Sequence, residues 1–308
     1  MFMWRKRPTA STTNQPRFEP AAVSLPNTSA AATVAADYYD SADADHFYAE
    51  VWGGEDIHIG LYDNPTEAIA TASRRTVSAL LELAGPVPAG GCVVDLGSGY
   101  GGASRLLAAT YGVQVQAINI SAVENQRHRQ LNVEAGLADR ITVHDASFES
   151  VPLADGCADL IWSQDAILHS GHRARVLEEV ARLLKPGGIF VLTDPMAADG
   201  VAMDLLQPIL DRIHLPDLAS PQRYLQWAEA VGLVREVWQD KTPMLVRHYD
   251  RVRQELRQRH DDLVGRISAG YLSRMDAGLG HWVEGGEAGR LSWGLMRFVK
   301  ADGGEARA

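Results

Sequence analysis

The stretch VVDLGSGYGG, residues 93–102, decides the fold of this 308-residue chain. An apolar run at 92–96 ends in a cluster of glycines, and a helical stretch follows. Glycine lets the backbone turn tightly and approach a ligand closely. We therefore expect a strand, a turn that holds a nucleotide-like ligand, and a helix that begins at this turn.

Short apolar runs and helical stretches alternate after this motif. The runs are VQVQAINI (113–120), ITVHD (141–145), ADLIWS (158–163) and IFVLTD (189–194). Ser121 and Glu124 form a capping box at the start of one helix, and another helix is expected near 172–184, before a turn at 185–188. This alternation predicts an α/β fold, a doubly wound, Rossmann-like parallel sheet with right-handed crossovers.

The flanking segments extend this pattern less regularly. Residues 197–231 and 244–288 are expected to be mostly helical, and two further strands are expected at 234–238 and 291–299. Upstream, Asn64-Pro65 is expected to begin a helix that runs to about Ala84.

The N-terminal part divides into two segments. Residues 1–35 are rich in Ala, Ser, Thr and Pro without periodicity, which predicts a disordered leader. The aromatic, glycine-bearing segment 37–62 is a poor helix or strand, so residues 36–64 are interpreted as a lid. The folded domain is expected to span 36–300, as one large unit.

Composition excludes several classes of function. The net charge is −10, from 39 acidic and 29 basic side chains, which disfavours nucleic acid and an anionic membrane surface as partners. The sequence contains no apolar stretch long enough to span a bilayer. Its two cysteines, Cys92 and Cys157, make no disulfide framework, so a cytoplasmic location is expected.

The glycine motif allows more than one ligand. Gly97, Gly99 and Gly102 fit the dinucleotide pattern GxGxxG, which is weak evidence alone. Asp95 would repel a pyrophosphate, and the second strand ends in Asn119 rather than in the acid expected for NAD. Asp145, after the third strand, could accept a hydrogen bond from an adenine amino group, so these features favour a ligand other than a dinucleotide.

The motif set resembles that of the class I S-adenosylmethionine-dependent methyltransferases. Their pattern D-x-G-x-G-x-G is present as Asp95, Gly97, Gly99 and Gly101, and LLKPGG at 183–188 also matches. The resemblance, over about 90–195, implies S-adenosylmethionine as cofactor, with the glycines beneath it and Asp95 near its amino-acid end.

Two further strand ends complete the implied cofactor site. Asn119 would replace the usual ribose-binding carboxylate, and Asp145, Ala146 and Ser147 would frame the adenine. The alternatives are a strand-end turn residue for Asn119 and a helix cap for Asp145.

A closer resemblance extends over nearly the whole chain after the leader. The segments that carry it are YYDSADADHFYAEVWGGEDIHIGLY (38–62), SQDAILHSG (163–171), TDPM (193–196), RIHL (212–215) and HW…G…SWG (281–294). They are similar to sarcosine/dimethylglycine N-methyltransferases and, more distantly, to phosphoethanolamine methyltransferases. The first family makes glycine betaine by N-methylation. The resemblance to this family implies that residues 197–231 and 244–288 are insertions that form the acceptor site.

The implied chemistry requires a neutral amine. With lysine as a guide, an amino-acid nitrogen has a pKa of roughly 10, so about one molecule in a thousand is neutral at pH 7. Asp165 and His169 would share one face if their segment is helical. By the resemblance, His169 is the catalytic base or orienting group and Tyr39 is its partner, with Tyr38 as the alternative. Asp165 is assigned to the cofactor end or to a helix cap.

Lid and insertion residues complete the implied site. Tyr48, Ile57 and His58 match lid positions that contact the cofactor's carboxylate, and Trp52 adds an aromatic face for a methylated ammonium. Arg212 and His214 match substrate-binding positions, since a guanidinium suits a carboxylate. Trp282 also matches, but Gly285 stands where a phosphate-binding Lys is expected, which favours a smaller carboxylate substrate.

Three other functions are compatible with parts of this sequence. Asp165, His169 and His172 lie close in sequence, but without a zinc-type spacing, and amine methylation needs no metal, so none is expected. A binding protein with a degenerate cofactor pocket is a second class. A third alternative changes only the acceptor, to glycine, phosphoethanolamine or a small zwitterionic thioether amino acid.

Overall fold

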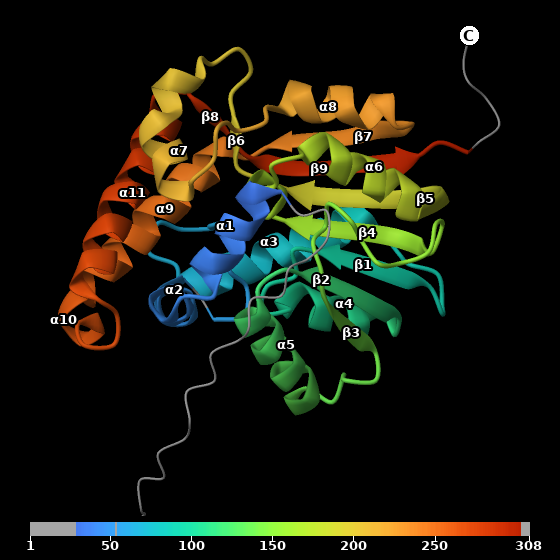
Figure 1. The fold of residues 1–308 in the computed structure, drawn as a ribbon, viewed down its shortest axis with the longest axis horizontal. Coiled ribbons are helices and arrows are strands. Elements are labelled where there is room, and N and C mark those ends of the chain that lie inside the picture. The colour runs from blue at the N-terminus through green and yellow to red at the C-terminus, as the bar shows by residue number, and fades with distance from the viewer. Residues whose placement is uncertain (1–28, 53, 303–308) are drawn as a thin grey trace, which may run out of the picture.

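A seven-stranded sheet forms the centre of the molecule in a computed structural model that describes residues 29–52 and 54–302. Its strand order is β3-β2-β1-β4-β5-β9-β7 (Figure 1). The strands are β1 (Cys92–Leu96), β2 (Gln114–Asn119), β3 (Ile141–Asp145), β4 (Ala158–Gln164), β5 (Leu184–Thr193), β7 (Leu233–Asp240) and β9 (Gly294–Lys300). The pairs among β1–β5 are parallel, and β9 is antiparallel to both its neighbours. The predicted doubly wound α/β fold is confirmed, and the strand order reverses beside β1, where such sheets bind ligands.

Helices cover both faces of the sheet because the central strands are apolar on both sides. Val93 of β1 packs with one set of helices, α3 (Ile69–Ala84) and α4 (Gly102–Tyr111). Val94 and Leu96 pack on the other face with a second set, α6 (Arg173–Leu183) and α8 (Pro221–Ala230). A fifth helix, α5 (Ala122–Glu134), follows β2 and packs against β2 and β3.

A separate helical layer lies beyond one end of the strands (Figure 1). It joins the N-terminal helices to the later segments in a third apolar core. Its elements are α1 (Ala30–Tyr39), α2 (Ala42–Phe47), a π-helical turn (Tyr48–Trp52), a 3-10 turn (Met203–Leu206), α7 (Gln207–Ile213), α9 (Thr242–Gln258), α10 (His260–Leu263), α11 (Ala269–Glu287), and the strand pair β6 (Met196–Ala197) and β8 (Leu291–Ser292).

The N-terminal prediction needs correction. Residues 30–35, which the sequence predicts as part of a disordered leader, belong to α1. Residues 1–28 of that predicted leader lie outside the described residues. The segment 37–62 is helical as far as Trp52, although its sequence is a poor helix. The reason is long-range packing, since Ser29 at the start of α1 binds Glu149, 120 residues away, and Asp43 of α2 caps α11 through Ser268.

Two predicted boundaries are also wrong. The helix expected from Asn64 begins at Ile69, because the Asn64 side chain accepts from the backbone N–H of Thr66 and closes a local turn instead. The turn expected at 185–188 lies within β5, where the pairing with β4 shifts its register.

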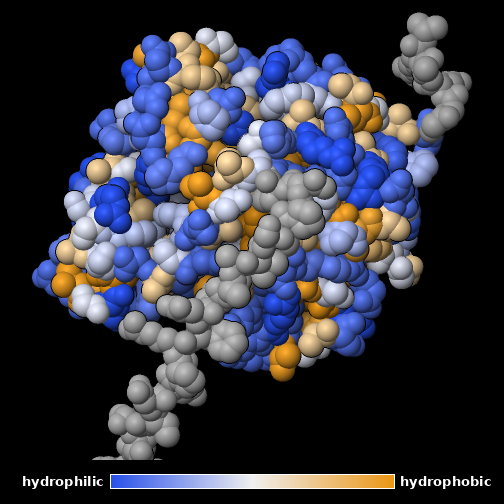
Figure 2. All heavy atoms as spheres, viewed as in Figure 1, coloured by the Kyte–Doolittle hydropathy of each residue, from blue (hydrophilic) through white to orange (hydrophobic). Residues whose placement is uncertain are grey.

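The surface is mostly polar on the face drawn in Figure 2, with apolar patches between the charged side chains. Large apolar residues that remain exposed lie on separate elements, such as Val133 on α5 and Val234 on β7. Within residues 29–52 and 54–302, no helix is long and apolar enough to cross a membrane.

Candidate active site

The turn after β1 is built for glycine. Gly97, Gly99 and Gly101 have φ values of 76°, 49° and 78°, a region that side chains rarely adopt. A Cβ on Gly97 would collide with Ala166, and one on Gly101 would collide with the His128 ring. The turn therefore lies close against the end of β4 and α5.

Two adjoining cavities open at this end of the sheet. The first, of about 650 Å³, lies over the glycine turn, and we call it the glycine-turn cavity. The second, of about 730 Å³, lies between the N-terminal helices and the later helical segments, and we call it the aromatic cavity. Both are lined by Ala35, Tyr39, Ile57, Asp165 and His169, so these residues form a common wall.

A carboxylate that sequence reasoning missed lines the glycine-turn cavity. Asn119, at the end of β2, donates from Nδ2 to Oε2 of Glu124 at 3.0 Å. Burial raises the pKa of Glu124 to about 7, although the bond from Asn119 lowers it. The sequence predicts Glu124 only as part of a capping box, and its backbone N–H does donate to the Ser121 hydroxyl at 3.1 Å. An amide and a carboxyl together therefore stand where hydroxyl groups could be bound.

Unpaired polar atoms mark the other end of this cavity. Gln164 is held through Oε1, which accepts from Trp162 at 3.0 Å, while its Nε2 has no partner among the described residues. Nδ1 of His58 is also buried without a partner in this part of the chain. Burial lowers the pKa of His58 to about 3, so the ring is neutral. Buried donors and acceptors of this kind normally have a ligand or water as partner.

Besides Tyr48, which is described below, four predicted cofactor residues lie outside this cavity. Asp95 is buried and accepts from the Ser104 hydroxyl at 2.6 Å, and burial raises its pKa to about 7. Asp145 is occupied by Asn125 and Arg129, at 2.7 and 2.6 Å. Two residues, Gly101 and Ala146, likewise do not line it, and Ser147 and Phe148 do instead.

The aromatic cavity has walls of stacked and edge-on rings. Tyr39 and Tyr48 lie 5.5 Å apart between ring centroids, and Tyr48 lies 5.3 Å from Trp52. Tyr249, which sequence reasoning missed, stacks on Trp282 at 4.9 Å. The indole N–H groups of Trp52 and Trp282 are buried without a partner among the described residues. Tyr48, predicted to bind the cofactor, lines this cavity rather than the glycine-turn cavity.

One cation lines the aromatic cavity. Arg212, on α7, donates to the sulfur of Met275 at 3.1 Å, and no carboxylate of residues 29–52 or 54–302 pairs with it. A Cβ on Gly278 would collide with its side chain, so this glycine makes room for it. His214, exposed and with φ of 54°, ends α7 at the edge of the cavity. A guanidinium without an acidic partner is a ready site for a carboxylate.

Tyr39 and His169 meet in the common wall. The Tyr39 hydroxyl and His169 Nε2 share a hydrogen bond of 3.1 Å. Burial, and then Arg173 and Arg212, lower the pKa of His169 to about 4, so the imidazole is neutral at pH 7. Tyr38, the alternative partner, instead bonds to Tyr271 at 2.9 Å.

The condition for Asp165 and His169 to share one helical face is not met. Asp165 has φ of 50° and precedes a 3-10 turn, Ile167–His169. Its two oxygens accept from Ile59 N–H and from Trp293 Nε1, each at 2.8 Å. Burial raises its pKa to about 6. Asp165 therefore anchors the segment 57–59 and is already occupied by these donors.

The predicted residues thus fall into three sets. The aromatic cavity contains Tyr39, Tyr48, Trp52, Ile57, Asp165, His169, Arg212 and His214. The glycine-turn cavity adds His58, Gly97, Gly99 and Asn119. Asp95, Gly101, Asp145 and Ala146 line neither cavity. No group of three or more metal-binding side chains is found in the described ranges.

Comparison with known proteins agrees with this geometry. A family model described as "Methyltransferase domain" matches residues 94–192. With the sheet order and the glycine turn, this match defines a class I S-adenosylmethionine-dependent methyltransferase.

Full-length relatives narrow the family. A dimethylglycine N-methyltransferase of Parasynechococcus marenigrum is 73% identical over 89% of this chain and 98% of its own length. A sarcosine/dimethylglycine N-methyltransferase of Halorhodospira halochloris is 51% identical, over 86% and 95%. This chain belongs to the sarcosine/dimethylglycine N-methyltransferase family.

Solved structures agree. A crystal structure from Galdieria sulphuraria, described as a sarcosine dimethylglycine methyltransferase, has a TM-score of 0.81 and 45% identity, and covers 86% of this chain and 99% of that one. A phosphoethanolamine N-methyltransferase of Haemonchus contortus, 18% identical with a TM-score of 0.76 over 90% of this chain and 61% of that one, shares the fold.

Proposed function

We propose that this chain transfers the methyl group of S-adenosylmethionine to the nitrogen of sarcosine and dimethylglycine, and so produces glycine betaine. The observation that carries the proposal is the aromatic cavity with one unpaired guanidinium, Arg212, joined to the glycine-turn cavity at Tyr39 and His169. The names of the 73% and 51% identical relatives support the same acceptors.

The glycine-turn cavity fits the cofactor. When bound, S-adenosylmethionine supplies an electrophilic sulfonium methyl group. Asn119 and Glu124 would bind its ribose hydroxyls, and Ser147 and Phe148 would lie against its adenine. The unpaired atoms of Gln164 and His58 would bind its amino-acid end.

The aromatic cavity fits a small, methylated amino acid. Arg212 would bind the carboxylate through its planar fork. The ring faces of Tyr39, Tyr48 and Trp52 would surround the nitrogen, because aromatic faces attract a cation that has no N–H groups to donate. The developing trimethylammonium is such a cation, so these rings stabilise the transition state as well as the product.

The Tyr39–His169 pair would take the proton of the bound ammonium. A neutral amine is required, and the loss of neutral amine at pH 7 is equivalent to roughly 4 kcal/mol. His169 is neutral and its Nε2 shares a hydrogen bond with the Tyr39 hydroxyl, so the pair would pass this proton on to solvent rather than keep it, because a group with a pKa of about 4 does not retain a proton at pH 7. Burial beside the sulfonium also disfavours the protonated amine.

A phosphorylated acceptor fits less well. Gly285 lies on α11 and supplies no cation, and a Cβ there would be 3.1 Å from Ile209 and 3.3 Å from Leu291, so a side chain at this position would require both neighbours to shift slightly. The cavity therefore offers Arg212 as its main cation, which suits one carboxylate better than a dianionic phosphate.

The unpaired cysteines, Cys92 and Cys157, agree with a reducing, cytoplasmic setting.

An acceptor panel tests the function. Purified protein is incubated with S-adenosylmethionine and glycine, sarcosine, dimethylglycine, phosphoethanolamine or methionine, and products are identified by mass. We expect betaine from dimethylglycine, with one S-adenosylhomocysteine per methyl group transferred. Methylation of phosphoethanolamine or methionine without betaine formation would replace the proposed acceptor, and cofactor binding without turnover of any of the five would favour a binding protein.

A further inference from the structure

Glu149 accepts hydrogen bonds from two parts of the chain that are distant in sequence, the start of α1 and the turn after His169. It follows β3, is 2% exposed, and lines neither cavity. Its Oε2 accepts from Ser29 N–H at 2.8 Å, and its Oε1 accepts from the hydroxyls of Ser29 and Ser170 at 2.8 and 2.5 Å and from His172 N–H at 3.3 Å. Burial alone would raise the pKa of Glu149, but these bonds hold it below its usual value.

The donors connect Glu149 to both partners of the reactive pair. Ser29 is the N-cap of α1, and Tyr39 is the last residue of that helix. Ser170 directly follows His169, at the end of the 3-10 turn. A Cβ on Gly171 would lie 2.8 Å from the Ser29 hydroxyl, so the two segments are packed closely where Glu149 joins them.

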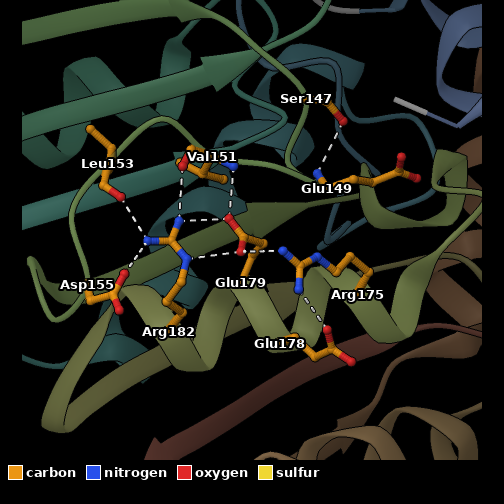
Figure 3. Close-up of polar contacts among 9 residues, drawn as sticks. All are labelled: Ser147, Glu149, Val151, Leu153, Asp155, Arg175, Glu178, Glu179 and Arg182. Carbon is orange, nitrogen blue, oxygen red and sulfur yellow. Dashed lines mark hydrogen bonds and ion pairs between the residues drawn. The ribbon is translucent and has the colours of Figure 1, made fainter. Parts of the chain in front are cut away.

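The loop that carries Glu149 is itself held firmly (Figure 3). Glu149 N–H donates to Ser147 Oγ at 3.1 Å, next to the wall of the glycine-turn cavity. Beyond it, Glu179 accepts from Val151 N–H at 2.9 Å, and Arg182 donates to Val151 O at 3.0 Å. The carboxylate is therefore fixed relative to α6 and not free to follow α1.

Helix α1 is also held at its other end, independently of Glu149. At the far end of α1, Asp40 accepts from the Ser121 hydroxyl at 2.6 Å. Loss of Glu149 would leave α1 bound to Ser121 through Asp40. The start of α1 would no longer be held at a fixed position relative to the turn that carries His169. The expected defect is a displaced hydrogen bond rather than an unfolded segment.

We propose that Glu149 is a positioning residue for methyl transfer, which ties the start of α1 to the turn of His169 and so sets the Tyr39–His169 hydrogen bond. This inference rests on the proposed role of that pair. A displacement of about 1 Å in a reacting group can cost on the order of a hundredfold in rate, so a remote tie of this kind has kinetic weight.

The test compares Glu149→Ala with Glu149→Gln, in the wild-type background and in a Tyr39→Phe background. Glu178→Ala is the matched control, because Glu178 is exposed and pairs with Arg175 in the same region (Figure 3). Initial rates of S-adenosylhomocysteine formation are measured with whichever acceptor wild type methylates, along with KM for the acceptor, Kd for the cofactor, and thermal unfolding.

We expect Glu149→Ala to lower kcat by about ten- to a hundredfold with cofactor Kd changed less than about threefold, and Glu149→Gln, which keeps one accepting oxygen, to lie between it and wild type. In the Tyr39→Phe background, the further loss should nearly vanish. A full additional loss in that background, or wild-type kcat in a folded Glu149→Ala, would overturn the inference. If Glu149→Ala does not fold, Ser170→Ala, which removes one bond, decides by the same comparison. Betaine formation by wild type is read separately, so a wrong acceptor assignment does not affect this outcome.

Discussion

At the level of single residues, His169 is a neutral imidazole in the wall between two cavities. We predict that His169→Ala lowers kcat by about 10²-fold or more, because removing a positioned base typically costs this much. Cofactor affinity, measured by calorimetry, should change little. A variant that turns over at the wild-type rate would remove His169 from the mechanism.

The pKa of His169 also makes a pH prediction. A group whose pKa in the fold is lowered to about 4 stays unprotonated from pH 5 to 9 and contributes no inflection there. The rate should instead rise with pH in this range, as the acceptor amine, with a pKa of roughly 10 in water, loses its proton. An inflection near pH 6.5 in kcat/KM that disappears in His169→Ala would show that the imidazole titrates normally.

Arg212 is predicted to determine acceptor binding. Arg212→Lys keeps the charge but loses the planar fork, so KM for dimethylglycine should rise by roughly tenfold or more, with a smaller change in kcat. Arg274→Ala is the control, since Arg274 lies over Tyr271 outside both cavities. Loss of cooperative unfolding in Arg212→Lys would instead make Arg212 a structural residue.

Sequence reasoning at this level succeeded where a motif fixes the backbone. Gly97 and Gly99 line a cavity, and the positive φ of both residues and the close approach of Ala166 to Gly97 favour glycine at these positions. It could not find Glu124, whose capping role is local while its side chain faces Asn119 across a strand end. It also could not foresee that Asn125 and Arg129 occupy Asp145, because these contacts come from a helix packed alongside.

At the level of elements, α6 holds the loop between β3 and β4 in place (Figure 3). Arg182 donates to Val151 O, Leu153 O and the Asp155 carboxylate, and it pairs with buried Glu179 at 2.8 Å. Burial alone would raise the pKa of Glu179, but its bonds to Arg182 and Val151 N–H hold it low.

Arg182→Met is therefore predicted to be destabilising. It leaves the Glu179 carboxylate buried with less compensation, which should cost about 2 kcal/mol or more of unfolding free energy. Because the pKa of Glu179 is depressed in the fold, its contribution is present at neutral pH and is lost as pH falls through that value. Urea unfolding at pH 7 measures the loss. Arg175→Ala, at a side chain that is 53% exposed, should change stability by under about 1 kcal/mol.

The difference between local sequence patterns and long-range contacts explains which elements the sequence predicts. The central strands β1 and β4 are buried on both faces, so each is a local apolar run that can be recognised without knowledge of its neighbours. Helix α1 is different, because its start depends on Glu149 and its end on Ser121. Its Ala-rich sequence has no strong apolar face, and only long-range contacts make it a helix.

At the level of the whole molecule, the cavities are assembled from the N-terminal helices, the sheet and the later helical segments. A ligand that fills them therefore favours the folded chain as a whole. At a hundred times its Kd, S-adenosylhomocysteine should add about 2.7 kcal/mol to stability and raise the unfolding midpoint by a few degrees. NAD is the control ligand, and a shift with NAD alone would restore the dinucleotide interpretation of the glycine motif.

Helix α1 covers both cavities at once, through Ala32 and Ala35 on one side and through Ala35 and Tyr39 on the other. We therefore expect that release of either the spent donor or the finished product requires α1 to move. Conversion of sarcosine to betaine takes two methyl transfers, and S-adenosylhomocysteine must be exchanged for S-adenosylmethionine between them. We expect this exchange to displace α1 from above the bound dimethylglycine. A time course that begins with sarcosine should therefore show dimethylglycine accumulating in solution before betaine appears, and betaine without such a lag would mean that the donor is exchanged beneath a closed helix.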